Sequence, residues 1–91
     1  MEFFGYSFSK NLYWVNNKEG VVVVDDQHQR SYVLESAESV LWRLLINQID
    51  AEAIVRQFSI IISVPEDQIM GKILSIIEGW KKKGLVERMN G

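Results

Sequence analysis

The sequence predicts an α+β domain in which a three-stranded antiparallel β-meander is followed by three α-helices. Two observations lead to this prediction. The first third of the chain alternates strand-forming runs with turn residues, and the remainder repeats apolar residues at helical spacing. With 91 residues the chain has room for one hydrophobic core, so residues 1–91 are expected to form a single domain.

Three runs rich in β-branched and aromatic residues form the predicted meander. Residues 11–16 (NLYWVN) and 21–26 (VVVVDD) flank the turn sequence NNKEG. The polar run DDQHQ makes the next turn, and residues 30–35 (RSYVLE) form the third strand, with Tyr32 and Leu34 on one face. Because the connections are short, neighbouring strands are expected to pair antiparallel.

The first two predicted helices each begin at a polar capping residue. Ser36 is the expected N-cap of the first helix and Asp50 that of the second. Ile49 precedes Asp50 and Ile54 follows it by four residues, which is the spacing of a hydrophobic staple.

The third predicted helix is the longest. Ser63 and Glu66 have the S-x-x-E spacing of a capping box, and Gly84 is expected to end the helix after Lys83. The residues after it, LVER (85–88), are expected to form a short extended return. The predicted inward stripe of the helix consists of Ile69, Ile73, Ile77 and Trp80.

Further apolar residues widen this stripe on both sides. Met70 and Leu74 extend it along one edge of the helix, and Ile76 extends it along the other. A helix that closes a small core needs an apolar arc of about 100°, and this arc is broader. Some apolar surface is therefore expected to remain beside the core.

Composition excludes several classes of function. The chain has no cysteine and a single histidine, His28, which excludes disulfides, thiolate nucleophiles, cysteine-based zinc sites and multi-histidine metal sites. A net charge of −2 gives no long-range attraction to nucleic acid. No apolar run approaches the ~20 residues of a membrane span, and the start MEFFGYSFSK lacks the features of a secretory signal. We expect a cytoplasmic protein with no nucleic-acid or membrane partner.

The strand-to-helix junction and the segments after it resemble a known family. The run YVLESAESVLWRLL resembles the yyeLNetaariWelL pattern of PqqD-like proteins, the peptide-binding modules called RiPP recognition elements. DAEAIVRQF is similar to the second helix of that family, VPEDQI to its proline–glutamate helix start, and ILSIIEGWKKKGLV to its closing lafLaeLaerGLl segment. The resemblance covers residues 9–87.

This resemblance implies a winged-helix-like domain that binds the leader segment of a ribosomally synthesised precursor peptide. In the family, the leader adds as an extra strand to the third strand and lies in the cleft toward the third helix. It is thereby presented to a modifying enzyme, such as a radical SAM enzyme, a leader peptidase or a cyclase. No cofactor is implied for the domain itself. Quinone-cofactor (PQQ), lasso-peptide and other RiPP pathways all use such domains.

The resemblance also suggests where the peptide binds. The expected peptide-binding residues are Arg30, Ser31, Tyr32, Val33 and Leu34 on the strand, and Met70, Ile73, Leu74, Ile77 and Lys81 on the helix. The opposite helix edge, formed by Lys72, Ile76 and Lys83, is the alternative, because sequence alone does not tell which edge faces the strand. Core packing explains Ile73 and Ile77 equally well.

Two other classes of function are alternatives to peptide binding. The basic cluster KKKGLVER favours DNA binding, but Glu66 and Asp67 stand at the amino end of the helix that would contact bases, where they would repel phosphates. Catalysis is not expected, because His28 lies in a polar turn without a partner suited to nucleophilic or metal chemistry. The adjacent Asp25 and Asp26 are typical of a turn rather than of paired catalytic carboxylates.

The amino-terminal aromatic residues suggest a further hypothesis. A domain of this size need not bury all of them, and exposed aromatic side chains would form a docking patch for a partner enzyme or for a second copy in a homodimer. The residues concerned are Phe3, Phe4, Tyr6, Phe8, Tyr13 and Trp14.

Overall fold

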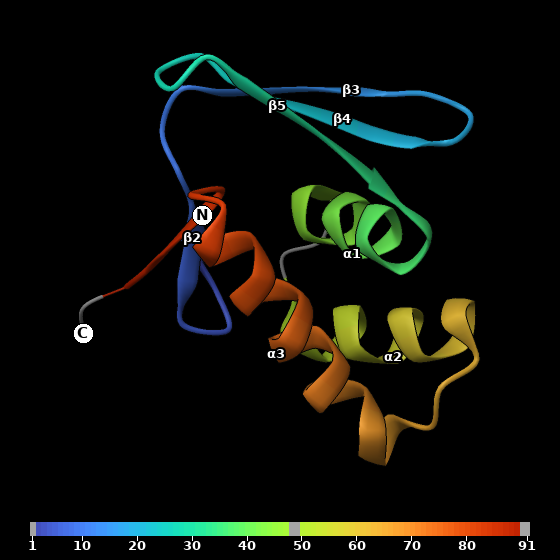
Figure 1. Cartoon of the computed structure of the whole chain (residues 1–91). Coiled ribbons are helices and arrows are strands. Elements are labelled where there is room, and N and C mark those ends of the chain that lie inside the picture. Colours follow the sequence, from blue (N-terminus) through green and yellow to red (C-terminus); the bar gives the residue numbers. More distant parts are fainter. Residues whose placement is uncertain (1, 48–49, 90–91) are drawn as a thin grey trace.

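The computed structural model describes residues 2–47 and 50–89, and within them it contains six strands and three helices. The elements in chain order are β1 (Glu2–Phe3), β2 (Tyr6–Phe8), β3 (Leu12–Asn16), β4 (Gly20–Asp25), β5 (Arg30–Glu35), α1 (Ser36–Asn47), α2 (Ala51–Ile62), α3 (Glu66–Lys82) and β6 (Val86–Arg88). The predicted order, a β-meander followed by three helices, is confirmed (Figure 1).

The strands form two separate antiparallel sheets of three strands each. The predicted meander is the sheet β3–β4–β5, in which Val23 lies between Trp14 and Tyr32 in register. The second sheet, β1–β2–β6, was not predicted as a sheet, although β6 is the extended return expected after the third helix. It joins the amino-terminal segment to this strand. In Figure 1 this small sheet lies at the carboxyl end of α3, whereas the meander lies over α1.

The meander has a buried inner face and an exposed outer face, because side chains alternate along each strand. Helix α1 packs against β4 and β5 on the inner side. Val23 and Leu34 are fully buried there, whereas Val15 and Val33 on the outer face keep 65% and 59% of their surface exposed.

The core connects the meander, the small sheet and the three helices. At one end of it the ring of Trp42 in α1 lies 4.5 Å from Phe8, 5.7 Å from Trp14 and 5.3 Å from Trp80, measured between centroids. These rings come from β2, β3, α1 and α3, so aromatic contacts join elements from most of the chain. The predicted inward stripe of α3 is confirmed, since Ile69, Ile73, Ile77 and Trp80 are fully buried.

Most of the amino-terminal aromatic side chains pack against the core. Phe3 and Tyr6 are buried, and the Tyr6 hydroxyl donates a hydrogen bond of 3.2 Å to Glu78 Oε1. Phe4 and Phe8 are partly buried against the same core. The hypothesis that Phe3 and Tyr6 are exposed in a docking patch is therefore wrong, because the small sheet places both side chains in the core. Tyr13 stays 62% exposed.

The helix ends agree with the sequence in part. Asp50 is the N-cap of α2, as predicted, and its side chain accepts the Glu52 N–H at 2.9 Å. The staple residue Ile49 lies outside the described residues. The predicted capping box is wrong, because Ser63 is the left-handed C-cap of α2 and Pro65 occupies the N-cap position of α3.

Strand β5 continues into α1 without a loop. Ser36 makes the change of direction with a φ of 52°, and its carbonyl accepts a hydrogen bond of 2.7 Å from the Ser39 hydroxyl. The end of α3 follows the prediction closely, with Lys83 as C-cap and Gly84 at a φ of 79°. None of the helices within residues 2–47 and 50–89 has both the length and the apolar content that a membrane span requires.

Candidate functional site

Strand β5 is an edge strand that pairs with β4 on one side. The hydrogen-bond alternation of the meander is fixed at its first turn, where the Asn17 N–H donates to the Gly20 carbonyl at 2.9 Å. In an antiparallel pair, directly opposite residues alternate between bonded and non-bonded pairs. Odd-numbered residues of β3 therefore bond to even-numbered residues of β4, and the odd-numbered residues of β4 are left to bond to β5.

The same alternation identifies the free backbone groups of β5. Tyr32 and Leu34 stand opposite Val23 and Val21 of β4 and share bonded pairs with them. The N–H and C=O groups of the intervening residues consequently point away from the sheet. These residues are Ser31, Val33 and Glu35.

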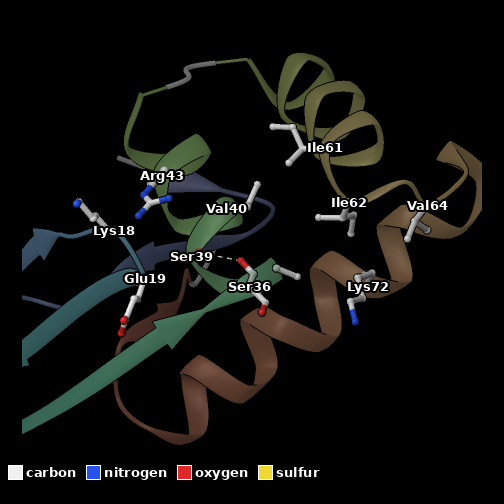
Figure 2. Close-up of a pocket in the computed structure, with 11 residues that line it drawn as sticks. Lys18, Glu19, Ser36, Ser39, Val40, Arg43, Ile61, Ile62, Val64 and Lys72 are labelled. Carbon is white, nitrogen blue, oxygen red and sulfur yellow. Dashed lines mark hydrogen bonds between the residues drawn. The ribbon is translucent and has the colours of Figure 1, made fainter.

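Helix α3 lies beside β5 and runs in the opposite direction (Figures 1 and 2). At one end, the Tyr32 hydroxyl donates to the Lys83 carbonyl at 3.3 Å, and Lys83 Nζ lies 5.6 Å from the centroid of the Tyr32 ring. At the other end, Lys72 lines a cavity together with Ser36, which directly follows β5. The edge of α3 that faces β5 is thus the one that carries Lys72, Ile76 and Lys83.

The structure therefore places beside β5 the helix edge that the sequence analysis gave as the alternative. Met70, Leu74 and Lys81 lie on the opposite edge of α3, on the side of the small sheet. Met70 lines a depression of about 320 Å³ with Phe4 and Val55. The Tyr6–Glu78 hydrogen bond joins β2 to α3 next to this edge.

Burial separates the ten expected peptide-binding residues into two groups. Leu34, Ile73 and Ile77 are fully buried, so their side chains belong to the core and offer no surface to a peptide. The exposed members are Arg30, Ser31, Val33, Met70, Leu74 and Lys81, and Tyr32 is partly buried. Contact of these exposed residues with a peptide stays a prediction.

A cavity of about 680 Å³ opens where β5 passes into α1 (Figure 2). Its polar lining comes from the β3–β4 turn, α1 and α3, and its apolar lining includes Val40 of α1, Ile61 and Ile62 of α2, and Val64. The sequence carries no pattern for this cavity, because four separate parts of the chain form its walls. Ser36, the expected N-cap where the third strand passes into the first helix, is the sequence signal that lies at this cavity.

Arg43 holds one wall of this cavity in place. Its Nε donates to Asn16 Oδ1 at 3.2 Å, and its guanidinium also donates to the carbonyls of Asn17 and Gly20 at 3.2 and 2.9 Å. These acceptors are neutral, so the positive charge is not compensated by them. These hydrogen bonds connect helix α1 to the first turn of the meander.

The cavity carries an excess of positive charge. Lys18, Arg43 and Lys72 line it, against one carboxylate, that of Glu19. Among residues 2–47 and 50–89, no lysine or arginine lies within 4.0 Å of a carboxylate oxygen. The three cations of the cavity therefore keep their attraction for an incoming anion.

Asp25 and His28 form a polar pair in the β4–β5 turn. The buried Asp25 carboxylate lies 2.7 Å from His28 Nδ1 and accepts the His28 backbone N–H at 3.2 Å, while the imidazole is 59% exposed. The hydrogen bond from the His28 side chain holds the pKa of Asp25 below its ordinary value. In the described part of the chain, no group of three or more His, Asp or Glu side chains is arranged to hold a metal ion.

No family model and no curated protein matches the sequence. Among solved structures, TbiB1 in complex with the TbiA(beta) leader peptide is similar, with a TM-score of 0.80 and 20% sequence identity over 93% of this chain and 99% of that chain. The fold is that of TbiB1. Because the similarity to TbiB1 spans nearly the whole chain, the predicted α+β fold is confirmed. TbiB1 itself was solved with a leader peptide.

Proposed function

We propose that this domain binds the leader segment of a ribosomally synthesised precursor peptide, which adds as a strand to β5. The observation that carries the proposal is the free edge of β5 at Ser31, Val33 and Glu35, which lies beside α3. The shared fold with TbiB1, a protein solved with a leader peptide, and the resemblance to PqqD-like proteins support it.

Strand addition suits a disordered guest, because the exposed N–H and C=O groups can be satisfied by a peptide of any sequence. Each such hydrogen bond contributes a net ~0.5–1.5 kcal/mol, and each buried leucine-sized anchor adds about 1.5–3 kcal/mol. Ordering the guest costs several kcal/mol, which leaves an affinity that is roughly micromolar or somewhat tighter. Such an affinity allows both recruitment and release.

The side chains around the free edge would then select the sequence of the peptide. The Val33 side chain projects from the outer face of the meander. The Tyr32 side chain points toward the carboxyl end of α3, where Lys83 Nζ lies over its ring. On the helix we assign this role to Lys72, Ile76 and Lys83, the edge beside β5. Met70, Leu74 and Lys81 are assigned only an indirect role, because they face the small sheet.

In this proposal the domain carries and presents its guest and does no chemistry. We assign it no catalytic residue and no cofactor, and we expect a separate modifying enzyme to act on the presented precursor. Cytoplasmic location stays a prediction.

A proline substitution tests strand addition directly, since proline removes one backbone N–H. Val33→Pro removes a free donor of β5 and leaves the β4–β5 bonds intact, and edge strands tolerate proline. Val33→Ala is the matched control, because it shortens the same exposed side chain and keeps the backbone N–H. The probes are leader segments of precursor peptides encoded beside this gene, titrated against each variant and followed by NMR.

We expect amide shifts of the unmodified protein to gather on residues 30–36 and along the Lys72–Lys83 side of α3. Val33→Pro should weaken binding by about tenfold or more, as several linked backbone contacts are lost together. Val33→Ala should bind within about threefold of the unmodified protein, since the backbone N–H of residue 33 is kept. Equal binding by both variants and the unmodified protein would rule out strand addition at β5.

A further inference from the structure

We infer that the cavity at the β5–α1 junction is a second recognition site, which takes an acidic side chain of the guest and a nearby aliphatic one. This inference rests on the proposed function, since the guest is the peptide paired with β5. It extends recognition beyond the sheet edge, over the amino end of α1 and into the space between α1 and α2.

The position of the cavity follows from the direction of β5. The free backbone groups of the strand end at Glu35, and the next residue, Ser36, lines the cavity. A guest strand that pairs with Val33 and Glu35 therefore leaves the sheet directly over it. Figure 2 shows Ser36 at the tip of β5, with Arg43 and Lys72 on either side of it in this view.

Charge determines what kind of side chain fits the first part of the site. Lys18, Arg43 and Lys72 line the cavity together with one carboxylate, that of Glu19, and the amino end of the α1 helix dipole adds to the positive potential. The carboxylate of Glu38 in the first turn is turned inward and accepts a hydrogen bond of 3.1 Å from Trp80 Nε1. A guest Asp or Glu is thus attracted, and a guest Lys or Arg is repelled.

The second part of the site is apolar and continuous with the first. A neighbouring cavity of about 400 Å³ is lined by Leu44 and Asn47, and it shares Val40, Arg43 and Ile61 with the charged one. Ile61 is 54% exposed at this shared wall. Burying apolar surface of this kind against an aliphatic guest side chain is favourable.

Two pairs of variants of the full chain test the inference, and each pair has a built-in control. Lys72→Gln removes a cation of the cavity, whereas Lys81→Gln makes the same change on the opposite edge of α3. Ile61→Ser removes the shared apolar wall, whereas Ile60→Ser changes a neighbour that is 71% exposed and lines neither cavity. All four side chains are exposed, so the domain is expected to fold in each case.

The probes are peptides selected from a random display library on the unmodified protein, together with copies in which each Asp or Glu is replaced by Asn or Gln. We expect the selected peptides to be enriched in an acidic residue with an aliphatic one close to it in sequence. Loss of the guest carboxylate should weaken binding by about three- to tenfold, and Lys72→Gln should reduce this difference, with Lys18 and Arg43 supplying what remains. Ile61→Ser should weaken binding by about fivefold, with Ile60→Ser and Lys81→Gln within about twofold of the unmodified protein.

The outcomes separate this inference from the proposed function. Peptides that lose binding with Val33→Pro but bind equally well with or without their carboxylate would overturn the second site and leave strand addition intact. Equal effects of Lys72→Gln and Lys81→Gln, or of Ile61→Ser and Ile60→Ser, would also overturn it. Selected peptides that are indifferent to Val33→Pro would instead contradict the proposed function.

Discussion

The two faces of the β3–β5 meander use similar residues for opposite purposes. On the inner face Val21, Val23 and Leu34 are fully buried against the helices, while on the outer face Val15 and Val33 remain more than half exposed. Residue type therefore does not tell which β-branched side chains hold the domain together. The position of a residue in the strand alternation decides whether its side chain is buried. At β5 this position also decides which backbone N–H and C=O groups are free.

Substitutions on the two faces of β5 should change the free energy of unfolding by very different amounts. Leu34→Ala should lower the free energy of unfolding by about 2–5 kcal/mol, because it leaves a cavity in the core. Val33→Ala, on the adjacent outer position, should cost at most about 1 kcal/mol. Urea denaturation followed by circular dichroism measures both. Similar losses for the two variants would mean that the register of β5 differs from the one described.

Hydrogen exchange distinguishes the bonded amides of β5 from the free ones, residue by residue. The N–H groups of Tyr32 and Leu34 bond to β4 and should exchange slowly, whereas those of Ser31 and Val33 should exchange nearly as fast as in an unfolded chain. Binding of a guest peptide should slow the second pair. Exchange rates from NMR test this alternation, and fast exchange at Ser31 and Val33 in the saturated complex would contradict strand addition.

Asp25, the polar residue of the inner face, should make a small and pH-dependent contribution to stability. Asp25 lies in the row of Val21 and Val23, and the hydrogen bond from His28 lowers its pKa. A lowered pKa in the folded state stabilises the fold above the ordinary aspartate pKa of about 3.9, and this contribution is lost as the pH falls through the folded-state pKa. Asp25→Asn should therefore be less stable than the unmodified protein at neutral pH, and the difference should shrink in acid.

Thermal melts across this pH range measure that difference. Asp26→Asn is the control, because it makes the same change at a neighbouring side chain that is exposed. If the difference in melting temperature between Asp25→Asn and the unmodified protein stays constant down to the lowest pH, the Asp25–His28 pair acts through packing alone.

The elements of the fold that have a periodic signal were predictable from the sequence. The runs at 11–16, 21–26 and 30–35 became β3, β4 and β5 with ends shifted by at most one residue, and the stripe of α3 is buried as expected. The small sheet was missed because strands of two or three residues are too short to show alternation. Their pairing also joins distant parts of the chain, such as Tyr6 and Arg88.

The site was less predictable than the fold, for two physical reasons. Helical spacing defines the width of an apolar arc but not which neighbour covers each of its edges, so the choice between Met70 and Lys72 as the side facing β5 needed the structure. Ser63 shows a related limit. Its spacing to Glu66 satisfies the capping-box pattern, yet the preceding helix uses it as a C-cap. Local patterns cannot decide between two neighbouring helices that compete for one residue.

The cluster of Phe8, Trp14, Trp42 and Trp80 has a practical consequence for experiments. Its three indoles belong to β3, α1 and α3, and neighbouring rings lie between 5.3 and 5.7 Å apart, in edge-on orientations. Such closely spaced chromophores couple optically, so their near-ultraviolet spectrum reports whether all three elements are in place. The domain thus contains its own label-free sensor of tertiary order, and any variant described above can be checked for native packing before its affinity is measured.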